Sequence, residues 1–172
     1  MEAYNVGISS AEVGVFNPAD GTVTGWTQIA VYKNTLKHVE EPGAETNHFE
    51  AGKSSPVKTH FENGMEKITF QIPKTDPDSL KQALDGDVTT VSGVKSWHKK
   101  KGTKKPIIRA FRYTSLDGTL VTVTKGQWNG SRNTDGSETA IWLMDITVTV
   151  LDTGFPLISD VIVKEPEEEE EV

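Results

Sequence analysis

The chain contains no cysteine among its 172 residues. This absence excludes disulfide bonds, thiolate metal ligands, iron–sulfur clusters and a cysteine nucleophile. No apolar run approaches the ~18–20 residues that a membrane-spanning helix requires, so no membrane partner is expected. The first four residues lack a basic stretch followed by a long apolar run, so we expect no secretory signal.

Charge is concentrated in two short segments. The chain carries 25 acidic and 18 basic side chains, for a net charge of −7, and six of the acidic residues fall within residues 165–172. We therefore expect one nearly neutral domain over residues 1–164, followed by an acidic, disordered tail over residues 165–172. The opposite charge gathers in a lysine cluster, which Gly102 and Thr103 interrupt as in a loop: Lys99, Lys100, Lys101, Lys104 and Lys105.

Alternating apolar and polar residues predict half-buried β-strands along much of the chain. The alternation is clear in residues 67–72, 121–124 and 146–150, and looser in residues 57–61 and 108–113. Asp-Gly and Asn-Gly pairs predict tight hairpin turns at five places: residues 20–21, 63–64, 117–118, 129–130 and 135–136. Short strands with regular turns predict a mainly β fold, an antiparallel β-sandwich or split barrel.

One segment has the pattern of a helix. Asp76 is a suitable N-cap, Pro77 suits the first helical position, and Gly86 is a natural stop, so we expect a short flanking α-helix over residues 76–84. Its apolar face and the strand faces should form one core, made of eight side chains: Ile68, Phe70, Ile72, Leu80, Leu84, Ile146, Val148 and Val150.

Residues 40–56 are polar and rich in glycine and proline. A long loop of this kind in a compact domain is usually functional or mobile. We expect it to be mobile in a free subunit and to become ordered between subunits. The candidate inter-subunit residues are Glu45, His48, Phe49, Glu50 and Lys53.

Two catalytic motifs are weak. Residues 47–54 end like a phosphate-binding loop, but Asn47 stands where the motif needs glycine, and Pro56 and a strand follow where it needs a helix. Residues 151–154 resemble the active-site triplet of aspartic proteases, whose chemistry needs two carboxylates. This chain has one copy, followed by Phe155, so a turn is favoured over a dimeric protease.

The four histidines, at positions 38, 48, 60 and 98, lack the spacing of metal ligands, so no metal, cofactor or catalytic residue is expected. The lysine cluster could bind nucleic acid, because Trp97 and His98 adjoin it. The acidic composition of the chain favours a different partner for these lysines, the acidic surface of a protein such as a second copy. We expect a non-enzymatic binding or assembly protein.

The order of the segments resembles that of phage major tail tube proteins. Residues 68–72 followed by residues 76–84 look like the strand and Asp-Pro step into a short helix of that family. Residues 105–108 and 113–119 are similar to its strand and Asp-Gly hairpin, and residues 143–151 to its final amphipathic strand. Residues 39–42 and 49–52 look like the preceding loop, and the resemblance covers roughly residues 30–152.

The resemblance implies a self-assembling virion protein of a phage or prophage tail, made in the bacterial host cytoplasm. Family members form hexameric rings whose inner sheets join into a β-barrel, and the rings stack into a tube. Implied partners are further copies, the tape measure and terminator proteins, and DNA as non-specific cargo in the lumen. The type VI secretion tube protein shares this architecture. A monomeric ligand- or carbohydrate-binding sandwich is the alternative, and it predicts exposed tryptophans among Trp26, Trp97, Trp128 and Trp142.

Overall fold

The structure is a computed structural model that describes residues 7–103 and 105–166. Eight strands form one antiparallel sheet: β1 (Ser10–Phe16), β2 (Val23–Ile29), β3 (Lys37–Glu40), β6 (Glu66–Ile72), β9 (Ile107–Thr114), β10 (Leu120–Asn133), β11 (Leu143–Val150) and β12 (Val161–Lys164). Two smaller hairpins pair β4 (Glu45–His48) with β5 (Lys58–Phe61), and β7 (Asp87–Val91) with β8 (Val94–His98). Lys104 and the glutamate tail from residue 167 onward lie outside the described residues.

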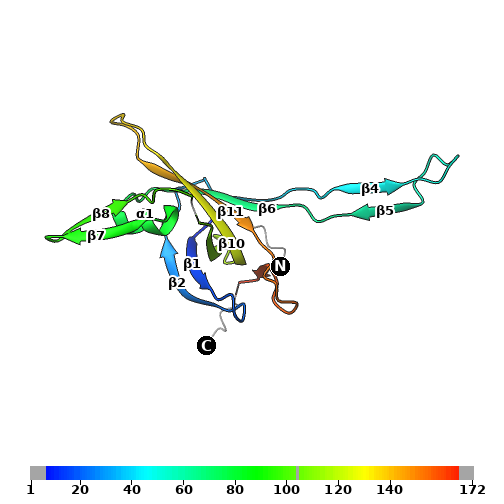
Figure 1. The fold of residues 1–172 in the computed structure, drawn as a ribbon, viewed down its shortest axis with the longest axis horizontal. Helices are drawn as coiled ribbons and strands as arrows, with labels where there is room; N and C mark the ends of the chain where they lie inside the picture. The colour runs from blue at the N-terminus through cyan, green and yellow to red at the C-terminus, as the bar shows by residue number, and fades with distance from the viewer. Residues whose placement is uncertain (1–6, 104, 167–172) are drawn as a thin grey trace.

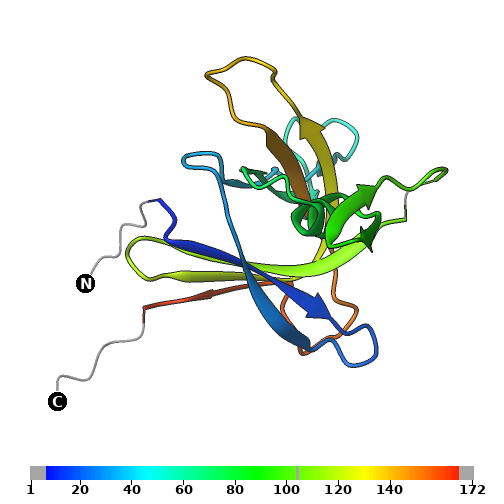
Figure 2. The ribbon, with the colours of Figure 1, turned by 90° about the vertical axis from the view of Figure 1, so that its left-hand side faces the viewer.

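The main sheet runs in the order β2–β1–β9–β10–β11–β6–β3. Strand β10 is 14 residues long and organises the sheet: its first part pairs with β12 and its second part with β11. The strands cross one another in Figures 1 and 2 instead of lying flat. Within the described residues the sheet does not close into a barrel, because β2 and β3 lie at its two ends. The predicted mainly β, antiparallel fold is confirmed.

The core is centred on three aromatic rings. Phe70 stacks on Phe111 at 5.0 Å between ring centroids, and Trp128 meets both rings edge-on. Six of the eight predicted core residues are buried around them: Ile68, Phe70, Ile72, Leu80, Ile146 and Val148. The other two, Leu84 and Val150, are partly buried against the same cluster. The alternating pattern therefore identified the correct faces of β6 and β11.

The predicted helix is present as α1 (Pro77–Leu84), with Asp76 as its N-cap. Ser79 donates to Asp76 through its backbone N–H at 3.2 Å and its hydroxyl at 2.7 Å. These bonds stabilise the carboxylate, and the side-chain bond is the main reason that the pKa of Asp76 is lowered. The helix packs on β10 and on the β7–β8 hairpin.

The turn predicted at residues 129–130 is wrong, because both residues lie inside β10 and pair with β11. Gly130 serves close packing there instead of a turn. A Cβ on Gly130 would lie 2.6 Å from Leu84 Cδ2 and 2.7 Å from the carbonyl oxygen of Ala83. The glycine therefore lets α1 approach the strand.

Two predicted turns are confirmed: residues 20–21 close the β1–β2 hairpin, and residues 117–118 close β9–β10. Residues 135–136 lie in the longer loop between β10 and β11. The turn predicted at residues 63–64 is wrong. It joins β5 to β6, which continue in line (Figure 1), so the chain does not fold back there.

Several elements have no counterpart in the sequence predictions, namely β1, β2, β3, β4, β12 and the β7–β8 hairpin. Ser92 and Gly93 close that hairpin with φ angles of 51° and 81°. No helix among the described residues is long and apolar enough to cross a membrane.

Candidate functional site

A two-stranded arm projects from the sheet (Figure 1). Its base is the β3–β6 pair and its outer part is the β4–β5 hairpin. The predicted loop over residues 40–56 is therefore wrong at residues 45–48, which form strand β4, and at residue 40, which ends β3. Glu45 and His48 lie in strand β4, whereas Phe49, Glu50 and Lys53 lie in the tip of the hairpin. Strand β5, predicted to be half-buried, is mostly exposed.

The arm has no core of its own. Every residue from 39 to 58 is exposed. Five large apolar side chains are among those that the arm exposes to solvent: Val39, Phe49, Val57, Phe61 and Met65. A lone two-stranded hairpin is marginally stable in water, and exposed apolar side chains gathered on one element mark an interaction site. The arm is thus suited to lie against another surface. Its mobility in a free subunit stays a prediction.

The arm is also acidic. Residues 40–62 contain five glutamates and two lysines. Glu50 pairs with Lys53 at the tip, and Glu41 pairs with Lys67 near the base at 3.2 Å. The other three glutamates form no ion pair with any described residue: Glu40, Glu45 and Glu62. The inner part of the arm, from the end of β3 to the start of the β4–β5 hairpin, therefore presents three glutamates without an ion pair in the described chain.

A polar cluster fixes the base of the arm to the sheet. His38 on β3 lies 2.5 Å from a carboxylate oxygen of Glu66 on β6, and its Nδ1 lies 2.8 Å from the hydroxyl of Tyr113 on β9. Burial raises the pKa of Tyr113 to about 12, and the charge of Glu66 adds to this effect. The phenol thus stays neutral at physiological pH and keeps its contact with His38.

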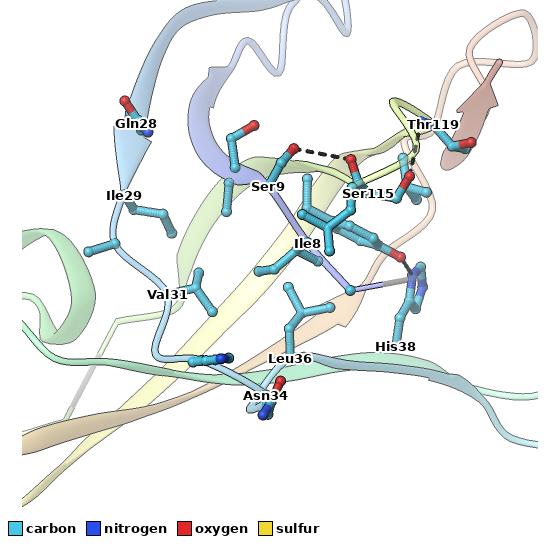
Figure 3. Close-up of a pocket in the computed structure, with 18 residues that line it drawn as sticks. Ile8, Ser9, Gln28, Ile29, Val31, Asn34, Leu36, His38, Ser115 and Thr119 are labelled. Carbon is cyan, nitrogen blue, oxygen red and sulfur yellow. Dashed lines mark hydrogen bonds between the residues drawn. The ribbon is translucent and has the colours of Figure 1, made fainter. Parts of the chain in front are cut away.

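Beside this cluster lies a cleft of about 740 Å³ (Figure 3). It opens between the start of β1, residues 30–36 and the β9–β10 turn. Its walls combine apolar side chains with hydroxyl and amide groups: Ile8, Ile29, Val31 and Leu36, with Ser9 and Asn34. No group of three or more potential metal ligands occurs in the part of the chain that the structure describes.

The lysine cluster was predicted to lie in a loop, and its described residues, 99–103 and 105, do lie in the loop between β8 and β9, the lysine loop. Its four described lysines are exposed: Lys99, Lys100, Lys101 and Lys105. Lys100 lies 3.1 Å and 3.2 Å from the two carboxylate oxygens of Asp85, at the end of α1. The backbone N–H of Gly86 and this ammonium together lower the pKa of Asp85. The other three lysines form no ion pair with a described residue.

The tryptophans do not form an exposed platform. Trp128 is buried, and Trp26 lies under the guanidinium of Arg112 at 4.3 Å. Trp97 is half-buried beside Arg132, and its indole N–H donates to the carbonyl of Asp85. Of the four tryptophans, only Trp142 is exposed to solvent, at 54%. The exposed face that a carbohydrate-binding module needs is therefore missing, and Trp97 is not free to stack on nucleic-acid bases.

The triplet at residues 152–154 lies in a turn after β11, as expected. The Asp152 carboxylate accepts the backbone N–H of Gly154 at 2.8 Å, and the Thr153 N–H donates to Asp160 at 2.8 Å. Both acidic side chains thus bond to the backbone of the turn.

Comparisons with known proteins are sparse. The chain matches no protein-family model, and no curated protein matches it. Among solved structures, it is similar to a chain of the anti-feeding prophage (AFP) baseplate, determined by cryo-electron microscopy with sixfold symmetrisation. The TM-score is 0.47 and the sequence identity 11%, over 97% of this chain and 99% of that chain.

Proposed function

We propose that this protein is a non-catalytic structural component of a phage or prophage tail. Its copies assemble into rings, hexameric as in the tail tube proteins that the sequence resembles, and the rings stack into the tube through which DNA leaves the virion. The observation that carries the proposal is the exposed arm. It displays large apolar side chains and unpaired charge that no described residue of the same chain covers.

The sheet supports the same function. Strand β2 ends the sheet on one side, and its outer edge pairs with no described strand. Such an edge pairs readily with a strand of another chain. Joining edges around a ring satisfies these backbone groups, as closure of a barrel does. The tape measure and terminator proteins of the tail are the further partners, and DNA is non-specific cargo. The type VI secretion tube is the neighbouring possibility and requires the same ring assembly.

A monomeric ligand-binding module is the second candidate function. The cleft of about 740 Å³ favours it, because ligand pockets are commonly ~300–1,000 Å³. The lack of an exposed tryptophan platform disfavours carbohydrate as the ligand.

Removal of the outer arm tests the proposal. In the variant, an Asn-Gly turn replaces residues 46–60 and joins Glu45 to Phe61, which face each other in the β4–β5 register. We expect the full chain to form rings or tubes in negative-stain electron microscopy and the variant to stay a folded monomer by light scattering. Circular dichroism and thermal melting confirm the fold of the variant. A full chain that is monomeric at every concentration, or a shortened chain that assembles normally, would overturn the proposal.

A further inference from the structure

We infer that the lysine loop of one copy binds the acidic inner part of the arm of the next copy. This inference rests on the proposed function and names the two surfaces that meet. On one side is the lysine loop, with Lys99, Lys101 and Lys105. On the other is the segment of the arm that carries Glu40, Glu45 and Glu62.

The two surfaces lie at opposite ends of the molecule. Figure 1 shows the β4–β5 hairpin at one end and α1 with the β7–β8 hairpin at the other. The bond between Lys100 and Asp85 holds the lysine loop at the end of α1. The arm therefore cannot reach the lysine loop of its own copy, and their contact has to join two copies head to tail. Contacts between different surfaces of identical chains build rings or open stacks.

The charges of the two surfaces are complementary. Residues 99–105 contain no acidic residue, and three of their lysines lack an ionic partner among the described residues. On the arm, one carboxylate oxygen of Glu45 accepts a hydrogen bond from the side-chain amide of Asn47 at 2.9 Å. Glu40 and Glu62 form no ion pair with the described chain. Complementary charge of this kind steers association and fixes register more than it adds affinity.

Apolar groups adjoin the charges on both sides. Phe61 faces Glu45 across the arm and is 70% exposed. Next to the lysine loop, Pro106 is exposed and Ile108 is 37% exposed. Protein interfaces typically combine an apolar centre with a polar rim, and both surfaces provide these two components.

Nucleic acid is the weaker partner for the lysine loop. Lys100 is already paired with Asp85, and Trp97 is packed against Gly86 and Arg132, where it cannot stack on bases. An acidic protein surface needs neither group, because three ammonium groups that form no ion pair within the described chain suffice for ion pairs across an interface.

Charge reversal and its compensation test this contact. The first variant carries Lys99→Glu, Lys101→Glu and Lys105→Glu. The second carries Glu40→Lys, Glu45→Lys and Glu62→Lys, and a third combines all six changes. The matched control reverses three exposed lysines elsewhere that form no ion pair with a described residue: Lys33, Lys74 and Lys164.

Assembly rate is followed by light scattering at low and moderate salt. Each of the first two variants should lose about tenfold or more of the wild-type rate at low salt, since charge steering changes association rates by ~10–10³. Added salt should reduce the difference in assembly rate between these variants and the wild type. The combined variant should regain most of the rate, and the control should assemble like the wild type. Circular dichroism and thermal melting establish that each variant is folded. If a charge-reversal variant does not fold, the variant with glutamine at the same positions replaces it.

The outcomes separate the two proposals. A wild-type chain that never assembles overturns the proposed function itself. A wild-type chain that assembles, together with a lysine variant that keeps its rate or a combined variant that stays inactive, overturns the arm-to-loop contact alone. If the lysine variant assembles normally but loses binding to a labelled single-stranded DNA oligonucleotide, the loop binds nucleic acid and the contact is likewise overturned.

Discussion

Gly43 and Gly64 lie diagonally across from each other where the arm leaves the sheet, and each packs directly on the opposite strand. A Cβ on Gly43 would lie 1.4 Å from the carbonyl oxygen of Glu62, and a Cβ on Gly64 would lie 1.4 Å from that of Glu41. Two backbone bonds flank the crossing, from Glu41 N–H to Met65 at 2.9 Å and from Glu62 N–H to Ala44 at 2.9 Å. The two glycines therefore set the direction in which the arm projects.

Gly43→Ala and Gly64→Ala should each abolish assembly while the fold survives. The added methyl group has no space, so the two strands of the arm must separate and the arm must change direction. The core lies elsewhere, so we expect Tm to fall by only a few degrees. Gly136→Ala is the control, because nothing lies within 4 Å of its added Cβ. Rings formed by either arm variant at the wild-type rate would contradict this role of the glycines.

The arm also shows where sequence patterns stop being informative. Strands β6 and β11 bury one face, so apolar residues alternate along them, and the buried face was predictable. Strand β4 is exposed on both faces, so its sequence carries no alternation and was interpreted as loop. Its pairing depends on backbone bonds and on polar contacts such as Thr59 to Asn47 at 2.6 Å.

Phe70→Ala should be strongly destabilising. Phe70 is 2% exposed and stacks on Phe111, so its removal empties a packed aromatic site. We expect a loss of ~3–5 kcal/mol in the free energy of unfolding, measured by urea denaturation. Tm should fall by about 6–20 °C. Phe61→Ala is the matched control, since Phe61 is 70% exposed and should leave Tm of the monomer nearly unchanged. Equal melting of both variants would mean that Phe70 is not part of the core.

Gly130→Ala should loosen the packing of α1 on β10. The new Cβ would press on Leu84 and on the carbonyl of Ala83, at 2.6 Å and 2.7 Å. Overpacking of this kind costs ~1–3 kcal/mol, and urea denaturation measures it. Hydrogen exchange should increase over residues 77–84. An alanine variant as stable as the wild type would show that the helix has room to move away.

The same glycine illustrates a second limit of sequence reasoning. An Asn-Gly pair is the usual signal of a hairpin turn, and at residues 129–130 that signal was misleading. Gly130 instead allows close packing against helix α1, where it lies next to Leu84, about 46 residues earlier in the chain. Likewise, the lysine loop was correctly located, but the bond from Lys100 to Asp85 depends on the β7–β8 hairpin, which no pattern announced.

Tyr113→Phe should change the stability of the fold in alkaline solution. The phenol has a pKa of about 12 in the folded chain, against ~10 when unfolded. The folded state therefore holds the proton more tightly. The stabilisation is fully present below pH 10 and is lost as the pH rises from 10 towards 12.

Thermal melts of the wild type and of Tyr113→Phe over this range measure the effect. At neutral pH the variant loses the bond to His38 and should be about 1 kcal/mol less stable. Between pH 10 and 12 the wild-type Tm should fall more steeply than that of the variant. Parallel pH profiles for the two proteins would mean that the Tyr113 pKa is not raised by folding.

If the arm joins copies of this chain into rings, electron microscopy of the purified 172-residue chain should show them directly. We expect closed rings or stacked tubes, in which the arm of one copy lies against the lysine loop of the next. Separate, single copies at every concentration and salt, with the arm free in solution, would contradict it.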